Sequence, residues 1–193
     1  MNRTNLNIYE YQEATYALGP GKRFALWVQG CPFNCKGCMT PDSTPFSKNK
    51  VYSVKRIAEK ILDIQDLFGL TISGGEPFMQ ADQLQSLIGI LKHNRPSLNY
   101  IVYSGFKIER LKWPAASLLL KEIDVLIDGL YVEKLNDNIG LRGSANQRSH
   151  FITDRLLMYK DHFHLAERSQ EEYSKNDGKL FVGLRPKLKT KVL

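Results

Sequence analysis

The sequence contains very little cysteine. Only three of its 193 residues are cysteines, and all three lie between positions 31 and 38. With none left elsewhere, a framework of distant disulfides is excluded, and thiols gathered in one stretch fit a reducing compartment. No apolar run approaches the ~20 residues that cross a bilayer, and the first residues carry no apolar signal region. We therefore expect a cytoplasmic protein with no membrane partner.

The sequence also lacks a concentrated block of charge within its body. The net charge is +7, but the lysines and arginines are scattered, apart from a basic end at residues 185–191. Such a tail is more often a solvated terminus than a binding arm, so we do not expect a nucleic-acid partner. Hydrophobic residues make up 42% of the chain, which excludes a disordered protein, and the length suits one domain with a full core.

The three cysteines, Cys31, Cys35 and Cys38, are separated by three and two residues. Thiolates at this spacing can surround a metal centre in one short loop, and Gly37 supplies the backbone freedom that the bend requires. A simple electron-carrying four-iron four-sulfur cluster normally takes four cysteines, so three leave one iron open to an exogenous ligand. The alternative is a zinc site closed by a distant histidine. The candidates for that fourth ligand are His93, His150, His162 and His164.

Short apolar segments alternate with amphipathic ones, which is typical of an α/β fold. Strands are predicted at residues 24–28, 67–72, 99–103 and 123–129, with a last strand at 180–184. Helices are predicted from the N-cap Ser53 to residue 64, over residues 81–92, up to residue 122, and from Asp154 to Tyr159. Residues 1–22 are predicted to form a lead-in without a strand, and residues 176–178 a turn. The last strand is predicted to pair in a hairpin with the segment before Glu171.

The carboxyl ends of the predicted strands carry the other candidate ligands, because α/β sheets bind ligands at that edge. The second strand runs into residues 73–77, with the sequence Ser-Gly-Gly-Glu-Pro. Its glycines let a ligand approach the backbone, and Glu76 can hold a cationic amine or, alternatively, cap the next helix. Asp128 ends the fourth strand, where an acid costs stability unless it meets a partner; we expect a cofactor amine or hydroxyl.

The CxxxCxxC spacing after one strand and the GGEP step after the next resemble the radical S-adenosylmethionine enzymes. The resemblance implies a four-iron four-sulfur cluster on Cys31, Cys35 and Cys38, whose open iron binds the amino and carboxylate groups of S-adenosylmethionine. It implies that one electron cleaves the sulfonium to methionine and a 5′-deoxyadenosyl radical, which takes a hydrogen atom from a substrate. It also implies cofactor contacts from the GGEP segment and from the end of the third strand. The residues concerned are Ser73, Gly74, Gly75, Glu76, Pro77, Tyr103 and Ser104.

Three further motifs narrow the resemblance to the activating enzymes of anaerobic, class III ribonucleotide reductases and their close relatives. They are GPGxR at residues 19–23, DGxY at 128–131 and RGSxNQR at 142–148. The position before the first glycine is Leu18, where many relatives carry an aspartate, so no role of that carboxylate is transferred. The resemblance implies hydrogen abstraction from a glycine near the carboxyl end of a large partner protein. It also implies that Arg142, with Asn146 and Gln147, holds the cofactor carboxylate or the incoming glycine loop.

The fold implied by the resemblance is a partial (β/α)6-type TIM-like barrel with mostly parallel strands and the cluster loop after the first strand. The chain is then a single radical S-adenosylmethionine domain over residues 1–193, with a core of about 19–153 and a C-terminal extension at 154–193. With no second cysteine cluster there is no internal electron relay. A flavodoxin-like reductant is therefore an expected partner, beside the large glycyl-radical protein.

Two other functions stay open at the level of the sequence. One is a compact radical enzyme that acts directly on a peptide, a nucleotide or another small molecule. The other is a non-enzymatic module that binds an iron–sulfur cluster or zinc. The C-terminal extension is longer than a minimal reductase activase needs, so it bears on the identity of the partner rather than on the radical chemistry.

Overall fold

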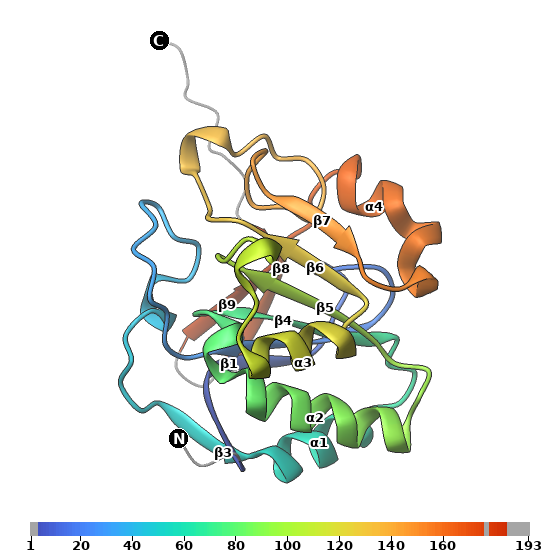
Figure 1. Cartoon of the computed structure of the whole chain (residues 1–193). Helices are drawn as coiled ribbons and strands as arrows, with labels where there is room; N and C mark the ends of the chain where they lie inside the picture. The colour runs from blue at the N-terminus through green and yellow to red at the C-terminus, as the bar shows by residue number, and fades with distance from the viewer. Residues whose placement is uncertain (1–3, 176–177, 185–193) are drawn as a thin grey trace.

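The computed structural model describes residues 4–175 and 178–184 of the chain. Among these residues, seven strands form one sheet, in the order β3-β1-β2-β4-β5-β6-β7, and two more form a separate hairpin, β8-β9 (Figure 1). The strands of the sheet are β1 (Asn5–Thr15), β2 (Arg23–Val28), β3 (Lys50–Ser53), β4 (Gly69–Gly74), β5 (Asn99–Ser104), β6 (Val125–Asp128) and β7 (Arg148–Phe151). The hairpin pairs β8 (Glu171–Lys175) with β9 (Gly178–Val182).

In the described part of the chain, four α-helices and five short 3-10 turns connect these strands. The helices are α1 (Val54–Leu62), α2 (Ala81–Asn94), α3 (Pro114–Glu122) and α4 (Lys160–His164). The 3-10 turns are η1 (Pro41–Ser43), η2 (Pro77–Gln80), η3 (Ile108–Arg110), η4 (Glu133–Leu135) and η5 (Asp154–Tyr159). Within the described part of the chain, every helix is too short or too polar to cross a membrane.

The centre of the sheet is parallel and its edges are antiparallel. Strands β2, β4, β5 and β6 run in the same direction, whereas β1, β3 and β7 pair antiparallel with their neighbours. All residues of β2 and β6 are buried, as parallel strands covered on both faces require. The mostly parallel central sheet of an α/β fold is thus confirmed. Among the described strands the order ends at β3 and β7, so the sheet is open.

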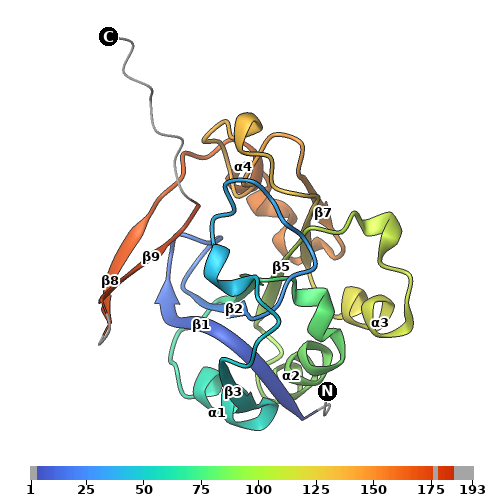
Figure 2. The same ribbon diagram turned by 90° about the vertical axis from the view of Figure 1, so that its left-hand side faces the viewer.

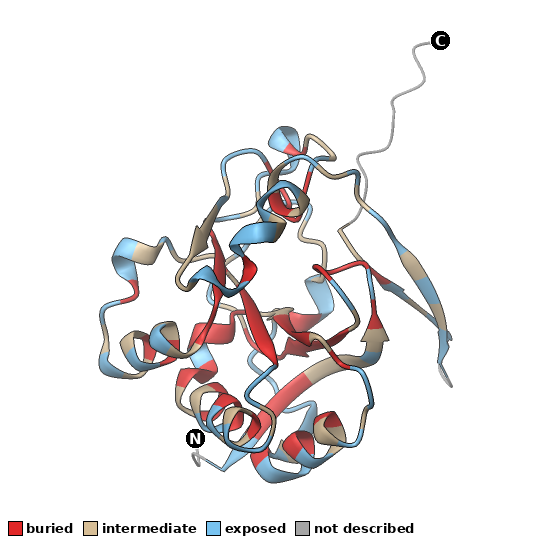
Figure 3. Cartoon of the chain, turned by 90° about the vertical axis from the view of Figure 1, so that its right-hand side faces the viewer, coloured by how far each residue is buried: buried red, intermediate tan, exposed pale blue. Residues whose placement is uncertain are grey.

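Helices α1, α2 and α3 cover one face of the sheet, where the largest apolar cluster lies (Figure 1). Alternate strand residues, such as Leu26 and Ile72, pack against them because successive side chains point to opposite faces. Helix α1 begins as predicted, with the Ser53 hydroxyl accepting a hydrogen bond from the Arg56 N–H at 3.2 Å. In Figure 3 the buried residues follow the central strands and the sheet-facing sides of these helices.

The C-terminal extension covers the other face. Near β5 and β6, Leu156 and Phe163 pack on Ile101, Val125 and Ile127. Near β2, the hairpin places Val182 against Ala25 and Trp27. Figure 2 shows the hairpin lying beside β1 as a separate ribbon, outside the main sheet. The extension therefore supplies the second apolar layer that a sheet buried on both faces needs.

The N-terminal ends of the parallel strands are joined by Arg23, a fully buried side chain. Its guanidinium donates to Pro20 O at 3.1 Å, Asn99 Oδ1 at 2.7 Å and Leu70 O at 2.9 Å. Five donors in a planar fork can satisfy several carbonyls at once, which suits a buried junction of three strands. The arginine of the GPGxR motif is therefore a packing centre at the edge of the sheet opposite the carboxyl ends of these strands.

Several sequence expectations are corrected by the structure. Residues 5–15 form β1, where only a lead-in was expected, so the cysteine segment follows the second strand of the chain, not the first. Strands β3 and β7 were also not predicted. The hairpin partner of β9 is Glu171–Lys175, not the segment before Glu171. Residues 176–177 of the predicted turn and the basic end lie outside the described residues.

The other predicted elements are confirmed with small changes at their ends. The strands expected at 24–28, 67–72, 99–103 and 123–129 appear as β2, β4, β5 and β6. The helices expected from Ser53, over 81–92 and up to residue 122 appear as α1, α2 and α3. Residues 154–159 are helical, but they form a 3-10 turn. Asp154 is the first residue of this turn and not its N-cap.

Candidate cofactor site

A cavity of about 130 Å³ opens at the carboxyl ends of β2, β4, β5 and β6. It is the place where a parallel sheet is expected to receive a ligand. Two segments contribute four lining residues each, the cysteine loop (residues 30–38) and the end of β4 (residues 73–76). The end of β5 contributes three, and the polar loop (residues 136–147) contributes two. The lining residues are Cys31, Phe33, Cys35, Cys38, Met39, Thr40, Thr44, Ser73, Gly74, Gly75, Glu76, Tyr103, Ser104, Gly105, Gly129, Tyr131, Gly143, Gln147 and Leu184.

The cysteine loop is fixed at its start and relatively free in its middle. Gly30 N–H donates to Ser43 O at 2.8 Å and Cys31 N–H to Thr44 O at 2.9 Å, so the end of η1, which follows the loop, lies beside the start of the loop. Inside the loop, Cys38 N–H donates to Cys35 O at 3.2 Å. All three thiols are free and partly exposed, which leaves them available to a metal centre.

The protein surroundings of Cys31 and Cys35 favour the neutral thiol. Burial raises the pKa of Cys31 to about 11, although the Phe33 N–H acts in the opposite direction. Burial also raises the pKa of Cys35, while the Tyr131 N–H lowers it. A bound metal reverses this balance, because a coordinating thiol loses its proton outright. Neutral thiols in the metal-free protein are therefore compatible with thiolate ligands in the loaded one.

The donor set fits a cluster better than a single ion. In residues 4–175 and 178–184, no three His, Cys, Asp or Glu side chains gather around one point as a single ion requires. An iron–sulfur cube makes a different demand, because each cysteine binds its own iron and the sulfurs are spread around the cube. Three thiols on the wall of one cavity meet that demand. None of the four histidines, all within the described residues, lines the cavity, so the zinc alternative has no fourth ligand.

The two glycines at the end of β4 pack against the start of the cysteine loop. Gly75 N–H donates to Val28 O and Glu76 N–H to Gly30 O, each at 2.8 Å. A Cβ at Gly75 would lie 2.3 Å from Gly30 O, and Gly74 has a φ of 100°. Both positions therefore require glycine because two backbones meet here. The close approach found here is between two segments of the protein backbone, and the predicted approach of a ligand stays a prediction.

Glu76 is the buried acid of the site, with 1% of its surface exposed. Its carboxylate accepts from Ser104 Oγ at 2.9 Å, Gly105 N–H at 2.7 Å and Phe78 N–H at 3.0 Å. Burial raises its pKa to about 7 in spite of these three donors. The Phe78 bond caps η2, so the capping alternative is correct. The same carboxylate lines the cavity, where a cationic amine would favour its charged form.

The end of β5 links the two sides of the cavity. Ser104 carries the bond to Glu76 and accepts from Phe106 N–H at 3.0 Å. Tyr103 O–H donates to Leu141 O of the polar loop at 2.6 Å, and burial raises the pKa of this phenol. Both residues line the cavity as predicted, and each also has a bonding partner within the protein.

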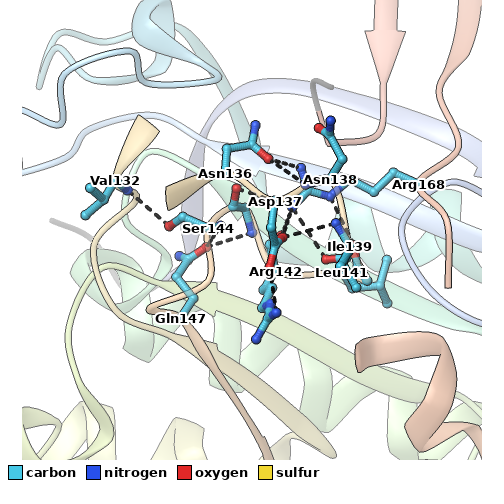
Figure 4. A network of polar contacts seen from close by, with 12 residues as sticks. Val132, Asn136, Asp137, Asn138, Ile139, Leu141, Arg142, Ser144, Gln147 and Arg168 are labelled. Carbon is cyan, nitrogen blue, oxygen red and sulfur yellow. Dashed lines mark hydrogen bonds and ion pairs between the residues drawn. The ribbon is translucent and has the colours of Figure 1, made fainter. Parts of the chain in front are cut away.

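Hydrogen bonds and an ion pair made by its own side chains hold the polar loop in its conformation (Figure 4). Gln147 accepts from Gly143 N–H at 2.7 Å and donates to Gly129 O at 2.6 Å, which ties the loop to the end of β6. Arg142 pairs with Asp137 at 2.6 Å. Gly143 and Gln147 reach the cavity, whereas Arg142 is not among its lining residues.

Asp128 is occupied within the protein. Its carboxylate accepts from Arg148 Nε at 2.9 Å and from Ile108 N–H at 2.6 Å, and His150 Nε2 lies 3.1 Å away. Burial opposes its ionisation, but Arg148 and the Ile108 N–H prevail and hold its pKa below the usual range. Asp128 is not among the cavity residues. The partner that its buried position requires is thus an arginine of β7, not the expected cofactor group.

The structure therefore divides the predicted site residues into two groups. Around one cavity it gathers Cys31, Cys35, Cys38, Ser73, Gly74, Gly75, Glu76, Tyr103 and Ser104. Outside the cavity wall it leaves Gly37, Pro77, Asp128 and Arg142. Gly37 has a φ of 72°, which is the bend expected of it, and Pro77 begins η2.

Sequence reasoning missed several residues of the wall. Phe33 lies between two of the cysteines and packs edge-on against Phe106, with ring centroids 4.7 Å apart. Tyr131 is the last residue of the DGxY motif, so the motif itself could have indicated it. Leu184 comes from the end of the hairpin and had no sequence signal, because only folding brings it near the cysteines.

Comparison with known proteins defines the class first. Residues 17–150 match the family described as "4Fe-4S single cluster domain", which is more than half of the chain. The chain is an iron–sulfur protein of that family. Among solved structures, the crystal structure of QueE from Escherichia coli has a TM-score of 0.37 and 16% identity over 53% of this chain and 52% of that one, a likeness too slight to carry an argument.

Curated relatives define the family more narrowly. The anaerobic ribonucleoside-triphosphate reductase-activating protein of Haemophilus influenzae is 32% identical over 152 residues, covering 75% of this chain and 97% of the relative. The Escherichia coli K12 protein of the same name is 27% identical over 76% of this chain and 99% of its own, and that of phage T4 is 30% identical over 70% and 88%. The chain belongs to this family. The radical S-adenosylmethionine assignment is thereby confirmed, with a four-iron four-sulfur cluster and S-adenosylmethionine as cofactors.

Proposed function

We propose that this protein activates an anaerobic ribonucleotide reductase by generating a radical on a glycine of that large partner. The observation that carries the proposal is the convergence of three cysteines, the Gly-Gly-Glu end of β4 and the polar loop on one cavity at the carboxyl edge of the sheet. The names of the curated relatives agree with it.

When bound, the cluster would supply the electron for reductive cleavage of S-adenosylmethionine, and that cleavage would supply the radical that takes the glycine hydrogen. The residues of the chain have other tasks. Cys31, Cys35 and Cys38 would hold the cluster and leave one iron without a protein ligand, available to the amino acid part of the nucleotide. The N–H groups of Phe33 and Tyr131 that point at two of the sulfurs stabilise the thiolates.

Glu76 is assigned to the amino group of the nucleotide. Its carboxylate lines the cavity, is almost fully buried, and is held in one orientation by three donors. A buried acid whose pKa is raised to about 7 gains from a neighbouring ammonium group, because the pair removes an uncompensated charge. Ser73, Gly74 and Gly75 form the adjoining backbone wall, and Tyr103 and Ser104 fix the position of the acid and of the polar loop.

Asp128 and Arg142 are assigned supporting roles. Asp128 anchors Arg148 and so fixes the start of β7, directly after the polar loop. Arg142 holds Asp137 within that loop. Their effect on the cofactor is then indirect, through the position of Gly143 and Gln147.

The finer points of fold and surroundings belong to the same proposal. The proposal of a partial (β/α)6-type barrel is supported by the four parallel strands with α1, α2 and α3 on one face. One domain is supported by the seven-stranded sheet, which takes its strands from residues 5–151 and so begins before the proposed core of about 19–153. The cytoplasm suits free thiols and an oxygen-sensitive cluster, and a flavodoxin-like protein suits a site with one cysteine group.

The test is radical formation on the partner. Protein reconstituted without oxygen should hold about four irons per chain and release 5′-deoxyadenosine from S-adenosylmethionine on reduction. Mixed with the large subunit of an anaerobic ribonucleotide reductase, it should produce the EPR doublet of a glycyl radical. The Cys35→Ala variant is the control and should give neither.

Other outcomes contradict the proposal in distinct ways. Nucleotide cleavage that converts a free small molecule, with no radical on any large partner, would make the protein a direct-acting radical enzyme. Zinc in place of iron, with no cleavage, would leave only a binding module. Both functions remain compatible with the sequence motifs, so this measurement decides between them and the activase.

A further inference from the structure

The C-terminal extension lies beyond the part of the chain that the family match covers. That match ends at residue 150, and relatives aligned over nearly their whole length account for about three quarters of this chain. The described part of the extension, residues 154–175 and 178–184, does not extend away from the cavity. It packs on the same face of the sheet as the cavity-lining Tyr103 and reaches the cavity at Leu184.

Arg168 supplies the side-chain contact between the extension and the polar loop (Figure 4), beside two backbone hydrogen bonds, from Gly140 N–H to Ala166 O at 2.8 Å and from Leu141 N–H to Phe163 O at 3.1 Å. Its side chain is 4% exposed. The guanidinium donates to Asn136 Oδ1 at 2.5 Å, to Gly143 O at 3.3 Å and to Arg142 O, and lies 3.6 Å from Asp137. A planar fork with five donors is suited to hold several carbonyls in fixed positions.

The loop that Arg168 holds reaches the cavity directly. Gly143 and Gln147 line it, and Gln147 also fixes Gly143 through its amide oxygen. Without the guanidinium, the carbonyls of Arg142 and Gly143 would lose a buried charged donor. A buried acceptor left without its partner costs free energy, so the loop would rearrange to reach water.

Leu184 closes a neighbouring side of the cavity. The hairpin that carries it is anchored at its start, where Glu171 accepts from Tyr16 N–H at 3.0 Å and from Thr15 Oγ1. Tyr173 O–H donates to Ala14 O at 2.7 Å, and Val182 packs into the cluster with Trp27. Gly183, with a φ of 120°, then turns the chain so that Leu184 meets the cavity.

We propose that the C-terminal extension is a working part of the cofactor site, in which Arg168 positions the polar loop and Leu184 forms an apolar wall beside the cysteines. The role assigned to the site rests on the proposed function, but the placement of the two residues can be tested without it. Arg168 is a positioning residue, because it acts through Gly143 and Gln147 and does not line the cavity itself.

The first test compares two arginines of the extension in the metal-free protein. In Arg168→Met, amide hydrogens of residues 140–147 should exchange at least about tenfold faster, because local opening becomes easier. The matched control is Arg155→Met. Arg155 also donates to three carbonyls, those of Pro96, Ser97 and Leu98, but these precede β5 at the opposite edge of the sheet. It should leave exchange in 140–147 unchanged.

Two results of this comparison would overturn the role of Arg168. One is unchanged exchange in its variant, and the other is equal acceleration in both variants, which would mean general destabilisation. If Arg168→Met does not fold, Arg168→Lys decides instead, since an ammonium group cannot reach every carbonyl of the fork. After reconstitution, the dissociation constant for S-adenosylmethionine should rise about fivefold in the Arg168 variant at unchanged iron content, and stay constant in the Arg155 variant.

The second test concerns the wall. In the metal-free protein, Leu184→Ala should raise the rate at which iodoacetamide alkylates the three cysteines about threefold or more, because the apolar cover is removed. Phe181→Ala is the control, since this side chain of β9 is 58% exposed and does not line the cavity. Equal rates in wild type and Leu184→Ala would overturn the assignment of the wall. The exchange and alkylation measurements use protein without cofactor, so their failure is distinct from a failure to form the glycyl radical.

Discussion

The cysteine loop and the polar loop both line the cavity, but they are held in place by different kinds of contact. The polar loop has internal partners for its functional side chains, such as Arg142 with Asp137 and Gln147 with two backbone segments. The cysteine loop is fixed mainly at its start, at Gly30 and Cys31, and by the ring of Phe33. The polar loop is held by contacts within the protein, whereas the cysteine loop would gain further contacts from a bound metal centre.

This difference explains where each loop can tolerate change. A loop whose ligands bind a cluster obtains part of its order from that cluster, because metal binding couples to folding. A loop closed by its own hydrogen bonds must be correct before any ligand arrives, since unsatisfied buried groups are costly. We therefore expect substitutions in the cysteine loop to remove the metal without unfolding the protein. Substitutions in the polar loop, or in the backbone junction where Gly75 meets Gly30, should reduce stability.

The largest expected effect is on metal content. Replacing Cys35 by alanine should reduce the iron from about four atoms per chain to near zero and abolish formation of 5′-deoxyadenosine, because one corner of the cluster loses its ligand. The free energy of unfolding of the metal-free protein should change little, as this thiol is partly exposed. Iron analysis, product analysis and urea unfolding check the three parts. Retention of iron or of cleavage would refute the ligand assignment.

The backbone junction beneath the cysteine loop gives the next largest effect. Gly75→Ala should lower the free energy of unfolding by about 3 kcal/mol or more, because the new Cβ would meet the Gly30 carbonyl and neither backbone can yield. Gly89 in α2 is the matched control, with nothing within 4 Å of a Cβ. Gly89→Ala should raise stability by about 0.5–1 kcal/mol through helix propensity. Equal effects of the two variants in urea unfolding would show that the junction is not tight.

The acid between the two loops should make stability depend on pH. Burial raises the pKa of Glu76 to about 7 in the folded protein, above its value in the unfolded chain. Its contribution is therefore fully present below about pH 4.5 and is lost as pH rises through 7, a total of roughly 3 kcal/mol. Glu76→Gln should remove this fall, as measured by urea unfolding of the metal-free protein at pH 5 and pH 8.

The difference between wild type and Glu76→Gln isolates this group from others that titrate in the same range. Burial lowers the pKa of His162 and His164, which gives an opposite trend that both proteins share. An identical pH dependence in the two proteins would contradict the assignment. Bound S-adenosylmethionine should lower the pKa of Glu76, so its presence should weaken the pH dependence of the wild type.

The smallest expected effect is on the stability of the polar loop. Gln147→Ala should lower the free energy of unfolding by about 2 kcal/mol, because the Gly143 and Ser144 N–H groups and the Gly129 carbonyl lose their partner. Iron content should remain unchanged, in contrast to the Cys35 variant. Loss of iron with unchanged stability would reverse the distinction between the loops.

Much of the site was predictable because its chemistry lies in short motifs. The cysteines, the glycine pair with Glu76, and the end of the third strand could be recognised from residue type and spacing, and they meet at one cavity. The partners of Asp128 and Arg142 could not be recognised in that way. An acid at a strand end signals that it needs a partner, but only the pairing of β6 with β7 reveals that the partner is Arg148.

The fold shows the same division. The strands β2, β4, β5 and β6 are short and continuously apolar, and they were found. Strand β1 was missed because its second half is mostly polar and its fully buried apolar residues are only Leu6 and Ile8, so its pairing with β2 rather than its composition makes it a strand. Strands β3 and β7 have four residues each, too few for a periodic pattern to be visible.

The sequence by itself determined the chemistry, since three thiols with a fixed spacing, and a glycine pair before an acid, restrict what can bind whatever surrounds them. The tertiary structure decided which charged residues face the cavity and which are paired elsewhere, because burial and pairing depend on neighbours distant in the chain. It also decided that the C-terminal extension belongs to the site. Leu184 and Arg168 carry no motif, and only the packing of the extension on the sheet brings them to the cavity and to the polar loop.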